Sequence, residues 1–305
     1  MASTSATLTR EVPQVLLRNI LVTTDFSEIA HKALWQGASI ARIHQSSVLI
    51  LHVVPPEPVV NSALEPASWE QQDVATKAKA EMEKMARNEA LTGIKCEVMV
   101  VTGELTEVVP DIIRDRDISL VVVGTHGRSG MHKMLLGSLS EEIVRVAQCP
   151  VLTIGPGVDA NALVHNRFES ILFATDFEQG SAHALPYAIA FALETRARLI
   201  LLHSIDEGSV NVSYLHEHLQ SEARARLAEM LPGGSVSSFT TDVEVVSGYP
   251  VEEILRIARK NQCDLIVMGV HKSKGLGAHA SAHLPWTIAH SVVCHAPCPV
   301  LTVRG

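Results

Sequence analysis

The stretch Leu120-Val-Val-Val-Gly124-Thr-His-Gly127, followed nine residues later by Gly137-Ser138, decides how this chain is interpreted. The apolar residues 120–123 are typical of a buried parallel strand. Glycines after a strand let the backbone approach an anion closely, and the free N–H groups at the start of the next helix point toward it. The spacing matches neither the Walker pattern nor the dinucleotide fingerprint. The sequence therefore predicts a phosphate-binding loop of another type.

An internal repeat runs along the whole chain. Its members keep their order, and the offset between them stays between 145 and 151 residues. The matching pairs are Ile20–Phe26 with Ile171–Phe177, Leu51-His52 with Leu202-His203, Val101–Gly103 with Val246–Gly248, Val122–His126 with Val267–His271, and Cys149–Thr153 with Cys298–Thr302. One domain is thus duplicated in tandem. We expect domain 1 over residues 1–157 and domain 2 over residues 166–305, joined by a Gly/Pro-containing linker.

Charge and apolar patterning exclude several classes of protein. There are 14 basic and 18 acidic residues up to Gly157 and 11 and 15 after it, so each half carries a net charge of −4. Neither half has the basic excess typical of nucleic-acid binding. No apolar run has the length of a membrane span or of a signal-peptide core. The five cysteines follow no disulfide pattern. We expect a cytoplasmic protein that binds neither membrane nor nucleic acid.

Strand and helix patterns alternate in each copy. In the first copy we expect strands at 20–24, 48–54, 96–101, 120–123 and 151–154, and helices at 28–43, 68–91, 105–114 and 138–147. Alternation of this kind implies an α/β fold, a parallel sheet covered by helices on both faces. Ligands of such sheets bind outside the carboxyl ends of the strands, where the strand order reverses. Asp25 and Gly124 both follow strands, so they are expected to converge on one crevice.

Together these residues resemble the universal stress protein family, over nearly the whole chain as two tandem copies. The loop matches its nucleotide signature, Gly-x-x-Gly, nine residues, Gly-Ser/Thr. The resemblance implies two Rossmann-like (adenine nucleotide alpha hydrolase-like) domains, each a five-stranded parallel sheet of order 3-2-1-4-5, with ATP in an intact copy. It also implies that the two last strands, 151–154 and 300–303, pair and make an intramolecular pseudo-dimer.

The resemblance assigns roles to particular residues. The acidic residue that contacts adenine or ribose corresponds to Asp25, with Thr23 and Thr24 beside it, and the residues that close over adenine correspond to Val53 and Val54. The phosphate side comprises Gly124, Gly127, Gly137 and Ser138, with His126, Arg128 and Leu139 nearby. Mg²⁺ is expected only as a companion of the phosphates, because the motif supplies no carboxylate cage.

Each of these residues also has a purely structural interpretation. The glycines can serve as turn formers, and Ser138 can serve as a helix cap alone. Asp25 can stabilise the start of the first helix, a role compatible with ligand contact. Arg128 can be a solvated loop charge.

The second copy departs from the pattern at the phosphate loop. Lys272 stands where the second glycine should be, and Trp286-Thr287 replaces Gly137-Ser138. We therefore expect the second copy to have lost ATP binding. His279 and His283 in the same loop have a spacing seen in metal sites, but no third ligand accompanies them, so we assign no metal site.

No catalytic constellation is visible in the sequence. The main hypothesis is an ATP-binding regulator or sensor in stress response, which acts on a protein partner that the sequence does not name. The alternatives are a slow ATPase or autophosphorylating enzyme, and a nucleotide-free scaffold or carrier of hydrophobic ligands. Further homodimerisation through another surface is left open.

Overall fold

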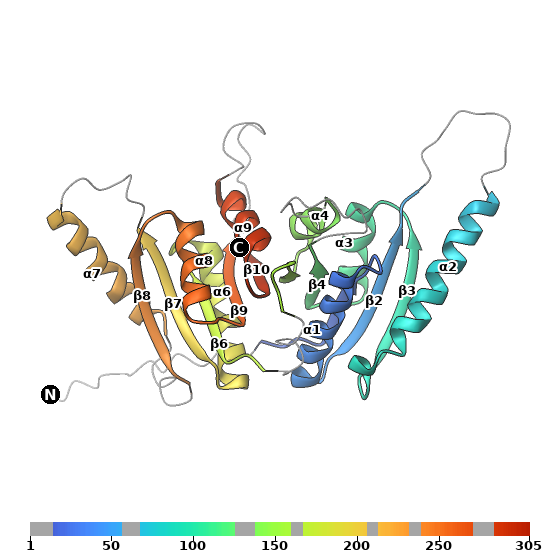
Figure 1. Ribbon diagram of the computed structural model, residues 1–305, viewed down its shortest axis with the longest axis horizontal. Helices are drawn as coiled ribbons and strands as arrows, with labels where there is room; N and C mark the ends of the chain where they lie inside the picture. The colour runs from blue at the N-terminus through green and yellow to red at the C-terminus, as the bar shows by residue number, and fades with distance from the viewer. Residues whose placement is uncertain are drawn as a thin grey trace, which may run out of the picture.

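A single ten-stranded sheet runs through the molecule in the computed structural model, which describes residues 15–56, 68–125, 138–159, 167–205, 213–231, 239–270 and 284–305. The strand order is β3-β2-β1-β4-β5-β10-β9-β6-β7-β8. All neighbouring strands are parallel except β5 and β10, which are antiparallel. Each half thus has the expected order 3-2-1-4-5. Figure 1 shows the halves side by side about β5 and β10, with α2 and α7 at the outer ends.

The elements of the two halves follow one another in the same sequence. The strands of the first half are β1 (Asn19–Thr23), β2 (Ser47–Val54), β3 (Cys96–Thr102), β4 (Leu120–Gly124) and β5 (Val151–Ile154). Its helices are α1 (Glu28–His44), α2 (Ser68–Ala86), α3 (Leu105–Asp115) and α4 (Ser138–Val146). The strands of the second half are β6 (Ser170–Ala174), β7 (Arg198–Ile205), β8 (Thr241–Ser247), β9 (Leu265–Val270) and β10 (Val300–Arg304). Its helices are α6 (Gln179–Thr195), α7 (Ser213–Glu229), α8 (Pro250–Lys260) and α9 (Leu284–His295).

One expected helix is shorter in the structure. The expectation of a helix over 68–91 was wrong at its end: α2 stops at Ala86 and a separate 3₁₀ turn, η1 (Glu89–Leu91), follows. The Asn88 side chain accepts a hydrogen bond from the Ala90 N–H and starts this turn. Asparagine competes for backbone hydrogen bonds in this way, which favours caps over helix interiors.

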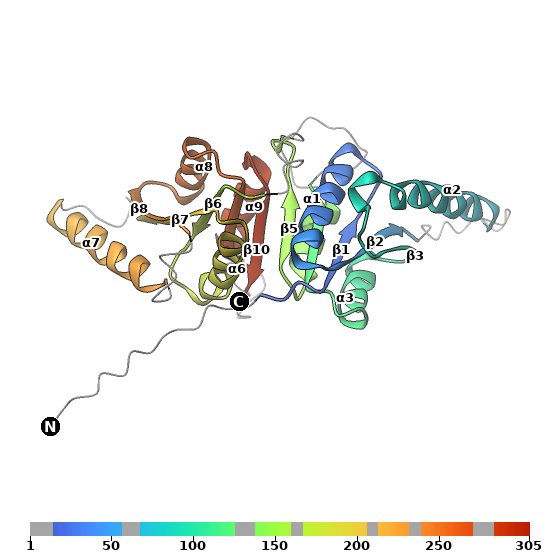
Figure 2. The same ribbon diagram turned by 90° about the horizontal axis from the view of Figure 1, so that it is seen from below.

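Alternate residues of the strands point to opposite faces of the sheet. On one face, Ile20 and Val22 join Ile171 and Phe173 in a core cluster that extends under α1, α2, α6 and α7 of both halves. On the other face each half has its own cluster, with Leu21 beneath α3 and α4 and Leu172 beneath α8 and α9. One continuous core therefore joins the halves. Figure 2 shows α1 next to β5 and α6 next to β10, and both helices pack on this shared core.

The two halves meet where β5 pairs with β10. Leu152 lies opposite Leu301, flanked by Thr153 opposite Val300 and Val151 opposite Thr302. Thr302 Oγ1 donates a hydrogen bond to the Val151 carbonyl (3.2 Å). The expected intramolecular pairing of the last strands is thus present in the structure.

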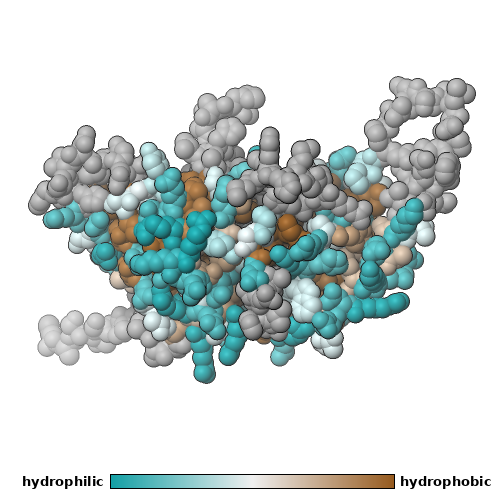
Figure 3. Space-filling model, in the orientation of Figure 1, coloured by the Kyte–Doolittle hydropathy of each residue, from teal (hydrophilic) through white to brown (hydrophobic). Residues whose placement is uncertain are grey.

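On the face drawn in Figure 3, hydrophilic residues make up most of the described surface, with patches of apolar residues between them. None of the described helices has the length and apolarity needed to cross a bilayer. All five cysteines carry free thiols. Burial raises the pKa of the Cys149 thiol to about 12 and that of Cys96 to about 11, so both stay protonated and unreactive at neutral pH.

Two equivalent threonines at the junction, Thr153 and Thr302, differ in their hydrogen bonding, and this difference predicts opposite effects on stability. Among the described residues, Thr153 Oγ1 is buried without a hydrogen-bond partner, whereas Thr302 Oγ1 has one. Thr153→Val should raise the free energy of unfolding by about 1 kcal/mol, because a methyl group replaces an unsatisfied hydroxyl. Thr302→Val, the matched control, should lower it by about 1 kcal/mol. Urea unfolding of both variants tests this, and equal losses in both would contradict it.

Candidate functional site

The strand order reverses between β1 and β4, and the carboxyl ends of these neighbours define the candidate site. Residues 20–22 of β1 pair with residues 120–122 of β4, so Thr24 and Asp25 leave the sheet beside Gly124 and Thr125. The Thr24 N–H donates to the Leu51 carbonyl (2.9 Å), and the Thr125 N–H donates to the Ile154 carbonyl (2.9 Å). The structure thus brings together two segments that lie far apart in the sequence, as the topology predicts.

Asp25 has one engaged and one unengaged carboxylate oxygen. Its Oδ1 accepts a hydrogen bond from the Ser27 N–H (3.0 Å), and the Ser27 hydroxyl in turn accepts from the Ala30 N–H (3.2 Å) and caps α1. Asp25 Oδ2 is buried and has no hydrogen-bond partner among the described residues. A buried carboxylate oxygen is costly unless it accepts hydrogen bonds, so this atom is suited to a donor from a ligand. The structural role of Asp25 and a ligand-binding role are therefore compatible.

Phe26 and His52, which the sequence analysis did not single out, stabilise the turn after β1. Phe26 has a φ of 65°, and its N–H donates to Thr24 Oγ1 (3.0 Å). The Phe26 ring lies against His52, with ring centroids 4.5 Å apart, and His52 Nδ1 donates to the Thr24 carbonyl (2.7 Å). The Thr24 hydroxyl also contacts the sulfur of Met85 (3.4 Å). The Thr24 side chain therefore shapes the turn, and Thr23, half-buried, ends β1 beside it.

The start of α4 lies next to the end of β4. Helix α4 begins at Ser138, and the Ser140 hydroxyl donates a hydrogen bond to the Gly124 carbonyl. Ser140, which the sequence analysis did not single out, is buried and fixes the first turn of α4 over the strand end. The first N–H groups of a helix lack partners within the helix and favour an anion.

The remaining predicted site residues fall into two groups. Val53 and Val54 end β2, which neighbours β1, so they share its strand-end edge. Val54 is buried and its carbonyl accepts from the Gly103 N–H (3.0 Å), whereas Val53 is partly exposed. Leu139 belongs to the first turn of α4. The other predicted residues, His126, Gly127, Arg128 and Gly137, lie outside the described part of the chain, as do Lys272, His279 and His283 of the second copy.

At the equivalent position of the second half, helix α6 lies very close to the end of β9. A Cβ added at Gly269 would lie 2.1 Å from the Gly180 carbonyl carbon, whereas one at Gly124 would meet the Ile29 side chain at 2.8 Å and the Ile29 carbonyl carbon at 3.1 Å. Gly180 aligns with Ile29 in the repeat. Without a side chain at this position, the first turn of α6 settles directly on the end of β9. Helix α6 therefore approaches β9 more closely than α1 approaches β4.

The carboxylate of the second half has partners within its own chain. Asp176 Oδ1 accepts from the Ser181 hydroxyl (2.6 Å) and from the Glu178 N–H (2.9 Å). Ser181 aligns with Ala30, which has no hydroxyl. The Arg226 guanidinium lies over the Phe177 ring, 4.0 Å from its centroid. Polar and charged side chains of the protein therefore occupy this turn in the second half.

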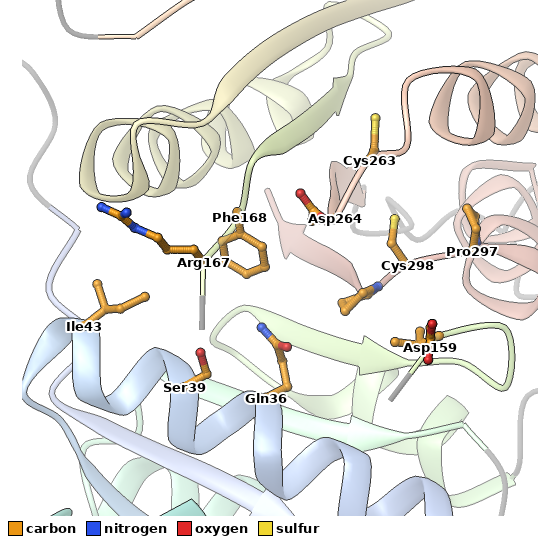
Figure 4. A pocket seen from close by; sticks show the side chains of 12 residues that line it. Gln36, Ser39, Ile43, Asp159, Arg167, Phe168, Cys263, Asp264, Pro297 and Cys298 are labelled. Atoms are coloured by element: carbon orange, nitrogen blue, oxygen red, sulfur yellow. The ribbon is translucent and has the colours of Figure 1, made fainter. Parts of the chain in front are cut away.

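A cavity of about 70 Å³ lies away from both strand-end sites, between the halves. Figure 4 shows Gln36 and Ser39 of α1 facing Asp264 and Cys298 of the second half across it. Asp264 Oδ2 already accepts from the N–H groups of residues 169 (2.7 Å) and 170 (2.9 Å). Burial raises the pKa of the Cys298 thiol well above its ordinary value, which keeps it protonated. In this cavity, Asp264 Oδ2 is therefore already engaged and the Cys298 thiol is unreactive.

Comparisons with known proteins agree with the repeat and the fold. The model of the universal stress protein family matches residues 17–155 and again residues 167–304. Universal stress protein Rv2005c of Mycobacterium tuberculosis is 26% identical over 303 residues, which cover 93% of this chain and 96% of that protein. Universal stress protein MJ0577 of Methanocaldococcus jannaschii is 26% identical over 155 residues, which cover 46% of this chain and 96% of that protein.

A solved structure has the same two-domain architecture. The crystal structure of a universal stress protein from Archaeoglobus fulgidus superposes with a TM-score of 0.68, covering 94% of this chain and 98% of that chain at 22% identity, which supports the fold. Since the family model matches both halves in turn, the chain belongs to the universal stress protein family as a tandem two-domain member.

Proposed function

We propose that the first half binds ATP, accompanied by Mg²⁺, at the carboxyl ends of β1 and β4, and that the protein acts as a nucleotide-dependent regulator in stress response. The observation that carries the proposal is the buried Asp25 Oδ2, which lacks a partner among the described residues. Ribose hydroxyls are donors of the kind this atom requires. The start of α4, anchored to Gly124 through Ser140, would receive the phosphates.

The groups at this strand-end edge fit the parts of a nucleotide. The N–H groups at the start of α4 are suited to phosphate oxygens, and the partly exposed Val53 is suited to an apolar contact with the base. Mg²⁺ would be held mainly by the phosphates and water. Within the described ranges no group of three or more His, Cys, Asp or Glu side chains is arranged to hold a metal ion by itself.

Identification of the bound molecule tests the proposal directly. Freshly purified protein is denatured, and the released small molecules are identified by mass spectrometry. Release of an adenine nucleotide at up to one per chain supports the proposal. A protein that releases none and does not take up added MgATP would instead favour the scaffold or carrier hypothesis. Product formation from labelled ATP then separates a regulator from a slow ATPase.

The glycine loop can be tested by copying the second half into the first. Gly127→Lys should abolish ATP binding, because a Cβ and a long side chain at this turn block the close approach of backbone to phosphate. Isothermal titration calorimetry with MgATP measures the loss, and circular dichroism checks the fold. Unchanged affinity in a folded variant would remove this loop from the site.

The carboxylate can be tested with a matched pair of variants. Asp25→Asn keeps an oxygen for the Ser27 N–H but removes the charge, and it should weaken ATP binding by roughly tenfold or more, as for loss of a hydrogen bond to a charged group. Asp176→Asn at the equivalent position should leave ATP affinity unchanged, since that carboxylate bonds to Ser181 and Glu178. Equal effects of the two substitutions, measured by calorimetry, would contradict the assignment.

The number of nucleotides per chain follows from the substitutions in the second half. We expect one ATP per chain, because Lys272 and Trp286-Thr287 replace the loop glycines and serine, and because Asp176 is bonded to Ser181. Calorimetric stoichiometry, checked against amino-acid analysis of the protein concentration, measures this. A value near two would mean that the second half binds phosphate in another way, for example through Lys272 and Lys274 as point charges.

A further inference from the structure

The second half contributes one arginine to a helix of the first half. Arg304, at the end of β10, donates from Nη2 to the Val144 carbonyl (3.2 Å) and to the Arg145 carbonyl. These carbonyls belong to the last turn of α4. Arg304 is partly buried, and this desolvation lowers the pKa of its guanidinium from its ordinary value. An arginine nevertheless stays protonated at neutral pH, so a full positive charge lies at the C-terminus of α4.

The helix equivalent to α4 in the second half is capped differently. There, Arg259 of α8 donates to the His295 carbonyl at the end of α9 (3.3 Å). The residue of the first half that aligns with Arg259 is Arg114. The Arg114 guanidinium instead donates hydrogen bonds to Asp111 (2.9 Å) and Asp115 (3.0 Å), both on α3. The second half thus caps its own helix, whereas the first half receives its cap across the junction.

The asymmetry extends to the position of Arg304 itself. Gly155 is the residue of the first half that aligns with Arg304. A Cβ at Gly155 would lie 3.3 Å from the Val293 carbonyl oxygen of α9, where Val293 aligns with Val144. The ends of α4 and α9 therefore both face the opposite half. Among the described residues, α4 receives a guanidinium from that half, whereas α9 receives one from Arg259 of its own half.

From this contact we infer that Arg304 is a positioning residue that holds the phosphate-binding end of α4 in place from the other half. The inference rests on the proposed function, since it concerns the same site. Helix α4 has only nine residues and is too short to be stable without tertiary contacts. Its first turn is anchored by Ser140, and its last turn by Arg304. A cation at a helix C-terminus also stabilises the helix through its dipole, whose positive end faces the phosphates.

The test compares full-length Arg304→Gln with wild type for MgATP and for adenosine by calorimetry. The ATP dissociation constant should rise roughly three- to tenfold, the range expected for loss of a partly buried charge at a helix terminus. The adenosine dissociation constant should stay unchanged, because base and ribose are assigned to β1 and β2 rather than to α4. Arg304→Lys should recover part of the ATP affinity, since it keeps the charge without the planar guanidinium.

Arg259→Gln is the matched control, since it removes an arginine cap from α9 in the half expected not to bind ATP. Its ATP affinity should equal that of wild type. If Arg304→Gln leaves ATP binding unchanged, or weakens ATP and adenosine equally, the positioning role is wrong.

A readout without nucleotide separates this inference from the proposed function. Hydrogen exchange of the free protein should be faster at residues 142–147 in Arg304→Gln than in wild type, with α3 unchanged. If wild type binds neither ATP nor adenosine, the proposed function fails, and the exchange result alone decides whether Arg304 holds α4. Unchanged exchange in α4 would overturn the inference.

Discussion

The antiparallel pairing of β5 with β10 is the interaction on which the rest of the structure depends. It converts two five-stranded parallel sheets into one sheet of ten strands and removes the edge that each half would otherwise expose. Because the pairing continues the sheet, one face can carry a single apolar core from α2 to α7. It also sets α4 against the end of β10, so that a residue of the second half reaches a helix of the first.

Two strand-end sites of common origin differ through a few small substitutions. Ile29 in the first half keeps α1 at a distance from β4, whereas Gly180 lets α6 rest on β9. In the first half Ser140 bonds to the Gly124 carbonyl, and the aligned residue of the second half is Ala289. The carboxylate after the first strand is present in both halves, and that of the second half accepts a hydrogen bond from the Ser181 hydroxyl, where the first half has Ala30. An unchanged acidic residue is therefore a weak guide to binding, because its neighbours decide whether it is available.

The sequence predicted the elements and topology well because they follow from periodicity and from the repeat. Strand β5 has its predicted bounds, and the site segments around Asp25 and Gly124 meet at one strand-end edge. The end of α2 was not predicted, although its signal is local: Asn88 caps η1 through Ala90, and asparagine favours caps over helix interiors. The expected loss of ATP binding in the second copy rested on Lys272 and Trp286-Thr287. The substitution of Ile29 by Gly180 between the two copies can be read from the sequence. Its effect on the distance between helix and strand can be seen only in the structure. Arg304 could not be identified, since its partners on α4 are about 160 residues away.

Duplication within one chain explains how such differences can exist. In a symmetric homodimer every residue appears twice, so an arginine at the end of the last strand would face the partner's helix on both sides. The tandem chain carries Arg304 at one of these positions and Gly155 at the other, and the two helix ends have different caps. One half can therefore support the other without receiving the same support in return. The same covalent link keeps the supporting half at a high effective concentration. On this argument, the second half contributes to the structure of the first through the shared sheet and through Arg304.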